Sequence, residues 1–285
     1  MNSVTHLTTE VVLDGLCFPE SPRWHEGRLW FSDMHGQSVM TLGHDGRARE
    51  VFSLATQPSG LGWLADGRLL VVSMFDRSLL CFENGALSRV ADLAHLARFH
   101  CNDMVVDARG RAYIGNFGYD FEEHAPCQLA GLIRVDPDGS SRIVANDLLF
   151  PNGTVITPDG RTLIVAETMA KRLTAFRVAE DGSLHERRIW AEFENATPDG
   201  ICLDAKGAIW IASPSSAEVL RVEEKGHITH RVPVKTQAIA CMLGGQDRRT
   251  LFVLTAPLKR AAKTRALRQG CIETVRVETP GAGLP

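Results

Sequence analysis

The sequence predicts an all-β protein, a six-bladed β-propeller with four antiparallel strands in each blade. Three observations indicate this fold: one strand-turn-strand pattern recurs six times, its turn glycines are spaced as in propeller blades, and helical patterns are nearly absent. A solenoid or β-sandwich also consists of hairpins, but a sandwich does not require six copies of one motif. The copies occupy residues 22–33, 60–73, 103–116, 153–167, 200–213 and 239–256.

Each copy combines a few apolar residues, a turn centred on glycine, and an alternating strand that ends in a small or acidic residue. The turn glycines lie about 40 to 50 residues apart, which is the period of propeller blades. They are Gly27, Gly67, Gly110, Gly160 and Gly207. A second hairpin follows each copy, for example around Asn84-Gly85 or Asp138-Gly139, which are dipeptides that hairpin turns prefer. One period therefore supplies the four strands of a blade.

The two ends of the chain are expected to complete the last blade, so that residues 1–285 form one propeller domain. Residues 271–278 supply one strand and residues 8–13 the outermost strand, which closes the ring and leaves only short, protected edges. Segment 256–268 has no convincing apolar stripe, and we expect it to be a loop. Its basic residues are expected to be solvated surface: Lys259, Arg260, Lys263, Arg265 and Arg268.

Composition argues against several classes of partner. The formal net charge of −3 creates no broad field for nucleic acid or for an anionic membrane, and no apolar stretch is long enough to span a bilayer. The N-terminal residues lack the pattern of a signal peptide. The seven cysteines are dispersed, with no C-x-x-C pair, and indicate reduced, packed thiols in a cytoplasmic protein.

Polar residues recur just before the innermost strand of each blade. Counting back eight positions from four of the turn glycines, and seven from Gly27, gives five oxygen-bearing side chains: Glu20, Ser59, Asn102, Asn152 and Asp199. Because inner strands start at one face of the disc, these residues share one mouth of the central channel. Carboxylate and amide oxygens suit a hard divalent cation, with Ca²⁺ favoured and Mg²⁺, Mn²⁺ or Zn²⁺ as alternatives. Taken one by one, the same residues are also typical of loop caps.

The same register separates two Pro-Asp-Gly tripeptides. Asp159 falls at a hairpin turn on the far face, where this tripeptide is ordinary turn chemistry, whereas Asp199 falls at the mouth. Connections over the mouth include residues 33–35, 116–120 and 168–169. The longest connection, residues 117–128, carries three aromatic side chains that either line a pocket or pack the loop onto the disc.

These residues resemble the SMP-30/gluconolactonase/LRE family of regucalcin-like lactonases over nearly the whole chain. The resemblance lies in Phe18-Pro19-Glu20-Ser21-Pro22, Asn102-Asp103, Pro151-Asn152-Gly153, Pro198-Asp199-Gly200 and residues 241–245. It implies that Glu20, Asn152 and Asp199 bind the metal and that Asn102 contacts the substrate or a metal-bound water. His100 stands where the best-known animal members have Arg, and Met104 stands where they have Gly.

The resemblance implies a metal-dependent hydrolase of the carboxylic ester class that opens a lactone ring. The metal would act as a Lewis acid and Asp199 as the general base. His100, Asn116 and Asp120, together with Asn102, are the expected contacts of the small lactone substrate. Three rivals are a phosphotriester or fluorophosphate hydrolase on the same metal, a non-catalytic ligand-binding propeller, and a strictosidine-synthase-like propeller; the Glu20, Asn152 and Asp199 set argues against the last.

Overall fold

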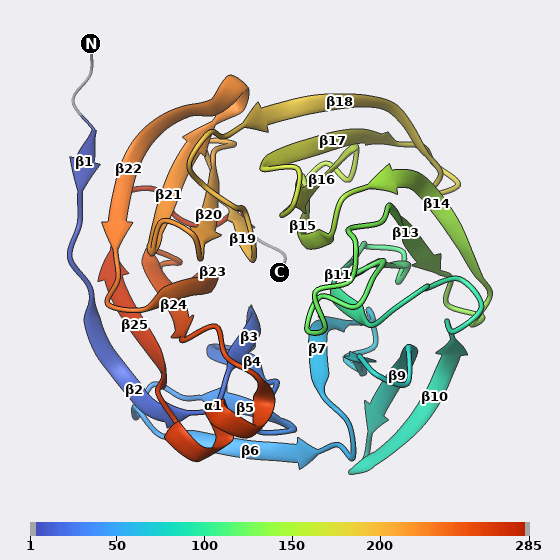
Figure 1. The fold of residues 1–285 in the computed structure, drawn as a ribbon, viewed down its shortest axis with the longest axis horizontal. Coiled ribbons are helices and arrows are strands. Elements are labelled where there is room, and N and C mark those ends of the chain that lie inside the picture. Colours follow the sequence, from blue (N-terminus) through green and yellow to red (C-terminus); the bar gives the residue numbers. More distant parts are fainter. Residues whose placement is uncertain (1–3, 283–285) are drawn as a thin grey trace.

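The computed structural model describes residues 4–282, which form six β-sheets arranged as blades around a central channel (Figure 1). This confirms the predicted six-bladed propeller. Blades 1 to 3 contain β3 Pro19–His25, β4 Arg28–Asp33, β5 Ser38–Leu42 and β6 Ala48–Ser53; then β7 Pro58–Trp63, β8 Leu69–Ser73, β9 Ser78–Glu83 and β10 Ala86–Asp92; then β11 Cys101–Val106, β12 Ala112–Asn116, β13 Ala130–Val135 and β14 Ser141–Leu148.

Blades 4 to 6 complete the ring. They contain β15 Pro151–Ile156, β16 Thr162–Glu167, β17 Arg172–Val178 and β18 Leu184–Glu192; then β19 Ile201–Leu203, β20 Ile209–Ser213, β21 Glu218–Glu223, β22 His227–Pro233 and, at the outer edge, β1 Thr5–His6; then β23 Gln237–Gly244, β24 Thr250–Ala256, β25 Gly270–Arg276 and β2 Glu10–Leu16. The described helices are the 3-10 turn η1 Glu224–Gly226 and the helix α1 Ala261–Leu267.

The hydrophobic core lies between neighbouring blades. The inner strands β3, β7, β11, β15, β19 and β23 surround the channel in Figure 1. Between blades 2 and 3, Leu70 and Val72 of β8 belong to the same buried cluster as Met104 of β11 and Ile114 of β12. Burying both faces of each sheet in this way holds adjacent blades together, because apolar area is removed from water at each interface.

The two ends of the chain meet in blade 6. Strand β2 pairs with β25 in antiparallel register, with Val11 opposite Glu273. The preceding residues then run along blade 5, where β1 pairs with β22 in parallel register, with Thr5 opposite His230. This fifth strand was not predicted from the sequence, since a two-residue strand carries no periodicity of its own.

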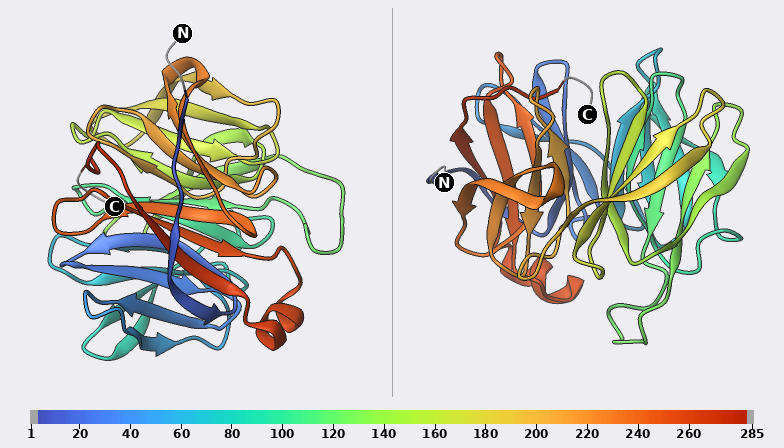
Figure 2. Two further views of the ribbon diagram at one scale, coloured as in Figure 1. Left: turned by 90° about the vertical axis from the view of Figure 1, so that its left-hand side faces the viewer. Right: turned by 90° about the horizontal axis from the view of Figure 1, so that it is seen from above.

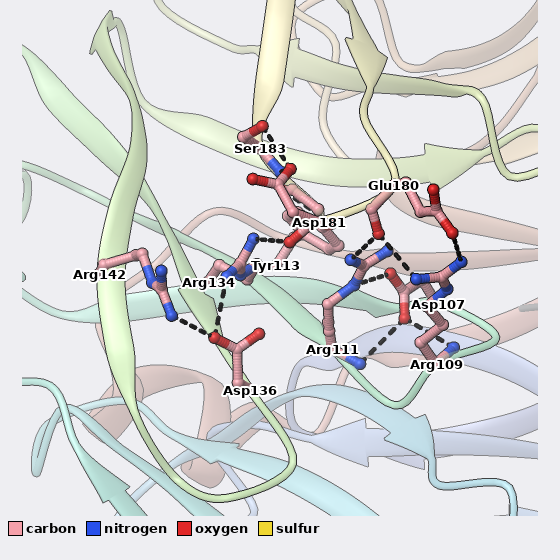
Figure 3. Close-up of polar contacts among 11 residues, drawn as sticks. Asp107, Arg109, Arg111, Tyr113, Arg134, Asp136, Arg142, Glu180, Asp181 and Ser183 are labelled. Carbon is pink, nitrogen blue, oxygen red and sulfur yellow. Dashed lines mark hydrogen bonds and ion pairs between the residues drawn. The ribbon is translucent and has the colours of Figure 1, made fainter.

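Ion pairs lock the turns of blades 3 and 4 on the face of the disc away from the mouth (Figure 3). The side chain of Arg111 contacts Asp107 at 2.6 Å and donates to the carbonyl of Glu180 at 2.9 Å. Arg134 similarly joins Asp136 at 2.9 Å to the carbonyl of Asp181 at 2.7 Å. Because each guanidinium binds a carboxylate of blade 3 and a backbone carbonyl of blade 4, the cluster connects the two blades.

Segment 256–268 is not entirely a loop, which corrects the prediction. Helix α1 occupies residues 261–267 and projects from the same face of the disc as the loop 117–128 (Figure 2). Three of its seven residues are alanines, which have the highest helix propensity. Its one buried residue, Thr264, contacts His35 at 2.7 Å between Oγ1 and Nδ1. Tertiary docking through Thr264 therefore replaces the apolar stripe that a free-standing surface helix would need.

The cysteines are free thiols, and Cys127 is the exposed one while Cys17, Cys81, Cys101, Cys202 and Cys241 are buried. The described part of the chain contains no helix with the length and hydropathy of a membrane span.

Candidate functional site at the channel mouth

β-Bulges place the predicted ring residues at the mouth, which we define as the end of the channel where the inner strands begin. In β3, β7, β11 and β15 the pairing register shifts directly after the first residues, next to Glu20, Ser59, Asn102 and Asn152. A bulge bends the strand and re-aims the side chain beside it. In blade 5, Asp199 lies two residues before β19, and its backbone N–H donates to the carbonyl of Ala212 at 2.9 Å.

Glycines allow the inner strands of blades 4, 5 and 6 to touch behind the ring. A Cβ atom on Gly153 would lie 2.6 Å from the carbonyl oxygen of Asp199, and one on Gly200 would lie 2.5 Å from Cβ of Ala240. Both distances are too short for any side chain. The Pro-Asn-Gly and Pro-Asp-Gly motifs therefore combine a candidate oxygen ligand with a glycine, the residue that fits where neighbouring inner strands are in contact.

The side chain of Asn152 is fixed by two hydrogen bonds from its amide nitrogen. Nδ2 donates to Oδ1 of Asp199 at 2.5 Å and to Oγ1 of Thr168 at 3.3 Å, while Thr168 Oγ1 donates to the carbonyl of Pro198 at 2.8 Å. The amide oxygen of Asn152 is buried and has no hydrogen-bond partner among the described residues. A buried polar atom without a partner is costly, so this oxygen is suited to accept a ligand.

Two buried carboxyl groups share this mouth. Glu20 and Asp199 are 7% and 8% exposed. Burial raises the pKa of Glu20 well above its ordinary value, and the nearby Asp199 and Asp103 raise it further. Burial also raises the pKa of Asp199 to about 8, against the opposing hydrogen bond from Asn152. Two such groups in one desolvated space favour either protonation or a bound cation.

The charge of Arg23 opposes the rise in the pKa of Glu20, but the guanidinium of Arg23 is bonded to Asp103 and not to Glu20 or Asp199. Arg23 forms a buried ion pair with Asp103 at 2.7 Å, with side chains 4% and 5% exposed, and also donates to the carbonyl of Met104. Arg23 lies on β3 of blade 1 and Asp103 on β11 of blade 3, so the pair connects non-adjacent blades. This role of Arg23 was not predicted from the sequence, where the acidic residue after Asn102 is the available signal.

The candidate metal ligands at the mouth offer oxygen atoms alone. Between residues 4 and 282, no three His, Cys, Asp or Glu side chains gather into a metal site. The mouth instead offers two carboxylates and the free amide oxygen of Asn152. These residues fit a hard divalent cation, because such ions accept carboxylate and amide oxygens together and complete their coordination with water.

The remaining ring positions differ in their surroundings. Asn102 is 5% exposed, and its amide nitrogen lies 3.4 Å from the carbonyl of Pro151 in the next blade. Ser59 is fully buried, and its carbonyl accepts a hydrogen bond from Ser32 Oγ at 2.7 Å. Ser59 is therefore part of the contact between blades 1 and 2.

Asn116 and Asp120 each form a hydrogen bond within the third blade. The amide of Asn116 donates to the carbonyl of Gly131 at 2.7 Å, and this residue lines a hollow of about 390 Å³ that contains none of the mouth carboxylates. A carboxylate oxygen of Asp120 accepts from the backbone N–H of Glu123 at 3.0 Å.

His100 lies within an aromatic cluster at the rim. Its ring centroid is 4.2 Å from that of Phe75 and 4.0 Å from that of Phe99. Burial lowers the pKa of His100 to about 4, although the nearby Asp120 acts in the opposite direction. His100 is therefore a neutral imidazole at neutral pH.

The loop 117–128 both packs onto the disc and leaves an aromatic face open. Phe117 stacks on Phe150 with centroids 4.4 Å apart, and Tyr119 is 8% exposed. Phe121 remains 42% exposed. Arg260, which precedes α1, reaches across to this loop and forms an ion pair with Glu123 at 3.0 Å. Two connections from blades 3 and 6 therefore meet beside the mouth.

The chain is a closed six-bladed propeller with two buried carboxyl groups and a buried amide oxygen at one mouth of its channel. The family model described as "SMP-30/Gluconolactonase/LRE-like region" matches residues 18–257, and the chain belongs to this family. This confirms the resemblance seen in the motifs around Glu20, Asn152 and Asp199.

Relatives within this family carry lactonase names. The chain is 28% identical over 190 residues to 6-deoxy-6-sulfogluconolactonase of Pseudomonas putida, which covers 65% of this chain and 64% of that protein's length. It is 28% identical over 270 residues to pentonolactonase XacC of Haloferax volcanii, with 88% and 86% of the two chains covered. The crystal structure of the calcium-binding protein regucalcin from Agrobacterium tumefaciens has the same fold, with a TM-score of 0.84, 23% identity, and 100% and 99% coverage.

Proposed function

We propose that this protein is a divalent-metal-dependent lactonase, a carboxylic ester hydrolase that opens a lactone ring. The observation that carries the proposal is the buried, unpartnered Oδ1 of Asn152 beside the buried carboxyl groups of Glu20 and Asp199. Family membership and the lactonase names of the relatives support the reaction class.

Glu20, Asn152 and Asp199 would hold the cation, with Ca²⁺ as the first candidate because all three offer oxygen. Mg²⁺, Mn²⁺ and Zn²⁺ accept the same ligands. When bound, the cation supplies Lewis-acid chemistry, which withdraws electron density from the carbonyl of the lactone.

The chain's own groups supply positioning and proton transfer. Asp199 accepts the proton of the attacking water, and Asn152 holds the carboxylate of Asp199 in place through the 2.5 Å hydrogen bond. Asn102 and the neutral His100 would contact the substrate from blade 3. Asn116 is bonded to the carbonyl of Gly131 and Asp120 to the backbone N–H of Glu123, so these two residues would act on the connection that carries them. General-base catalysis of this kind contributes roughly 10²- to 10⁴-fold.

The test is a pH-indicator hydrolysis assay on sugar, aliphatic and aromatic lactones and one phosphotriester. Wild-type protein is compared with chelator-stripped and metal-restored protein. We expect lactone turnover that the chelator abolishes and a divalent ion restores. Turnover of the phosphotriester alone would replace the lactonase proposal, and a folded, cation-loaded protein without turnover would contradict any hydrolase.

Asp199→Asn is expected to lower kcat for the best lactone at least a hundredfold, because it removes the general base and one charged ligand. The matched control is Asp159→Asn in the other Pro-Asp-Gly tripeptide, where the carboxylate only accepts turn hydrogen bonds from Thr157 and Arg161. Equal activity of Asp199→Asn and Asp159→Asn would remove Asp199 from the mechanism.

A further inference from the structure

The residue two positions before a ring residue stands at the rim of the mouth. Three of the five rim positions carry a ring: Phe18 before Glu20, His100 before Asn102 and Phe150 before Asn152. The carbonyl of each accepts a backbone hydrogen bond from the next connection of its own blade, at 2.9, 3.0 and 3.2 Å from Met34, Phe117 and Thr168. These three positions therefore carry rings next to the starts of the inner strands, two residues before the candidate ligands.

Aromatic side chains form a nearly continuous arc from blade 2 to blade 4, which we call the aromatic rim. Successive centroid distances are 4.2 Å for Phe75–His100, 4.0 Å for Phe99–His100, 6.0 Å for His100–Phe117, 4.4 Å for Phe117–Phe150 and 5.7 Å for Phe121–Phe150. Phe75 and Phe121 are each 42% exposed, so the arc offers apolar surface to a ligand at the mouth.

The polar groups of this arc are poorly suited to a polyhydroxylated ligand. The amide of Asn116 is used by the carbonyl of Gly131, and a carboxylate oxygen of Asp120 already accepts from Glu123. His100 is enclosed by Phe75 and Phe99. A hydroxyl group pressed against such a wall loses water without gaining a partner, which is unfavourable, whereas an alkyl or aryl group gains from burial.

We infer that the aromatic rim binds an apolar substituent on the lactone ring, so that alkyl- or aryl-substituted lactones are preferred over polyhydroxylated sugar lactones. This inference rests on the proposed lactonase function. The names of the relatives refer to sugar lactones. The aromatic rim lies outside the oxygen-ligand motifs, so these motifs do not determine which substituent the lactone carries.

The first experiment measures kcat/KM for δ-lactones with no side chain, a propyl group or a pentyl group on the ring carbon beside the ring oxygen. Glucono-1,5-lactone is the comparison. We expect kcat/KM to rise about threefold for each added methylene. A flat series, or a preference for the sugar lactone over the pentyl lactone, would overturn the inference.

Two rim variants localise the effect. Phe75→Ala and Phe121→Ala remove exposed rings and are expected to lower kcat/KM for the pentyl lactone at least tenfold, with a smaller loss for the unsubstituted ring. The matched control is Ile189→Ala on β18, the outermost strand of blade 4, where the side chain is 51% exposed. This control should leave the whole series unchanged.

Calorimetric titration with the corresponding non-hydrolysable δ-lactams separates the rim from the reaction. The pentyl lactam is expected to bind at least tenfold more tightly than the unsubstituted lactam, and Phe75→Ala should reduce this ratio. If no lactone is hydrolysed but the pentyl lactam still binds at least tenfold more tightly than the unsubstituted lactam, the lactonase proposal is wrong and apolar binding at the rim is supported. If lactones are hydrolysed but the two lactams bind equally, the rim inference fails alone.

Discussion

Thr168 decides which way the amide of Asn152 faces. Its hydroxyl accepts from Asn152 Nδ2 and donates to the carbonyl of Pro198, so the oxygen of Asn152 is left for a ligand. Thr168 would act on the site through its hydrogen bond with Asn152. Residues of this kind orient the ligands of metal sites, and their loss commonly weakens metal affinity.

Thr168→Val preserves the shape of the side chain but removes both hydrogen bonds. We expect the free energy of unfolding to fall by about 1 kcal/mol and the Ca²⁺ affinity to fall about tenfold. Urea denaturation and calorimetric Ca²⁺ titration measure the two effects. Thr157→Val is the control, since its hydroxyl bonds Asp159 in a far-face turn. Unchanged Ca²⁺ affinity in Thr168→Val would reduce Thr168 to a packing residue.

At the scale of elements, helix α1 depends on contacts outside itself. It lacks a side-chain N-cap and docks through Thr264 onto His35, while Arg265 donates to the carbonyl of His35 at 3.4 Å. The ring of Phe18 covers the imidazole, with centroids 4.6 Å apart. Burial first, and then the charge of Arg265, lower the pKa of His35 to about 4.

The docking of α1 should therefore depend on pH. Since the pKa of His35 is lower in the folded state than in the unfolded chain, the unfolded chain binds protons first as the pH falls. The stabilisation is present above about pH 6.5 and is lost as the pH falls towards 4. Between pH 7 and 5 we expect His35 to account for roughly 1–2 kcal/mol of lost stability.

Comparison of wild type with His35→Gln by urea denaturation at both pH values isolates this contribution. Gln retains an amide that can donate to the hydroxyl oxygen of Thr264, which itself donates to the carbonyl of Ala261, but Gln does not titrate. His95→Gln, at an exposed position, is the control. The same pH dependence in wild type and His35→Gln would show that His35 does not carry the effect.

At the scale of the whole molecule, two kinds of long-range contact hold the ring. Pairing of β2 with β25 brings together residues from opposite ends of the chain. The Arg23–Asp103 ion pair connects blade 1 to blade 3 beneath the mouth. The first contact closes the ring, because blade 6 is built from both ends of the chain. The second contact joins two blades that are not neighbours.

Arg23→Met should leave Asp103 as a buried, unpaired charge and destabilise the protein by about 3–5 kcal/mol. The double variant Arg23→Met with Asp103→Leu should recover most of this loss, because no charge remains buried. Urea denaturation of both variants measures the difference. Arg49→Met breaks an exposed ion pair with Asp45 and should leave stability nearly unchanged. A double variant as unstable as Arg23→Met would show that packing, and not charge, dominates.

The sequence by itself determined the blade repeat and the register of the ring residues. Both follow from short-range rules: glycine turns, strand alternation, and a distance of seven or eight residues from each turn glycine back to the ring residue. The same rules distinguished Asp199 at the mouth from Asp159 at a turn, although both lie in Pro-Asp-Gly.

Only the tertiary structure decided how the site is held. It revealed that Thr168 orients Asn152, that Arg23 is used by Asp103, and that Phe150 stacks on Phe117. It also revealed helix α1 and strand β1, which are stabilised by docking onto other blades. These contacts join residues from 16 to 229 positions apart, and local patterns carry no information about partners at such separations.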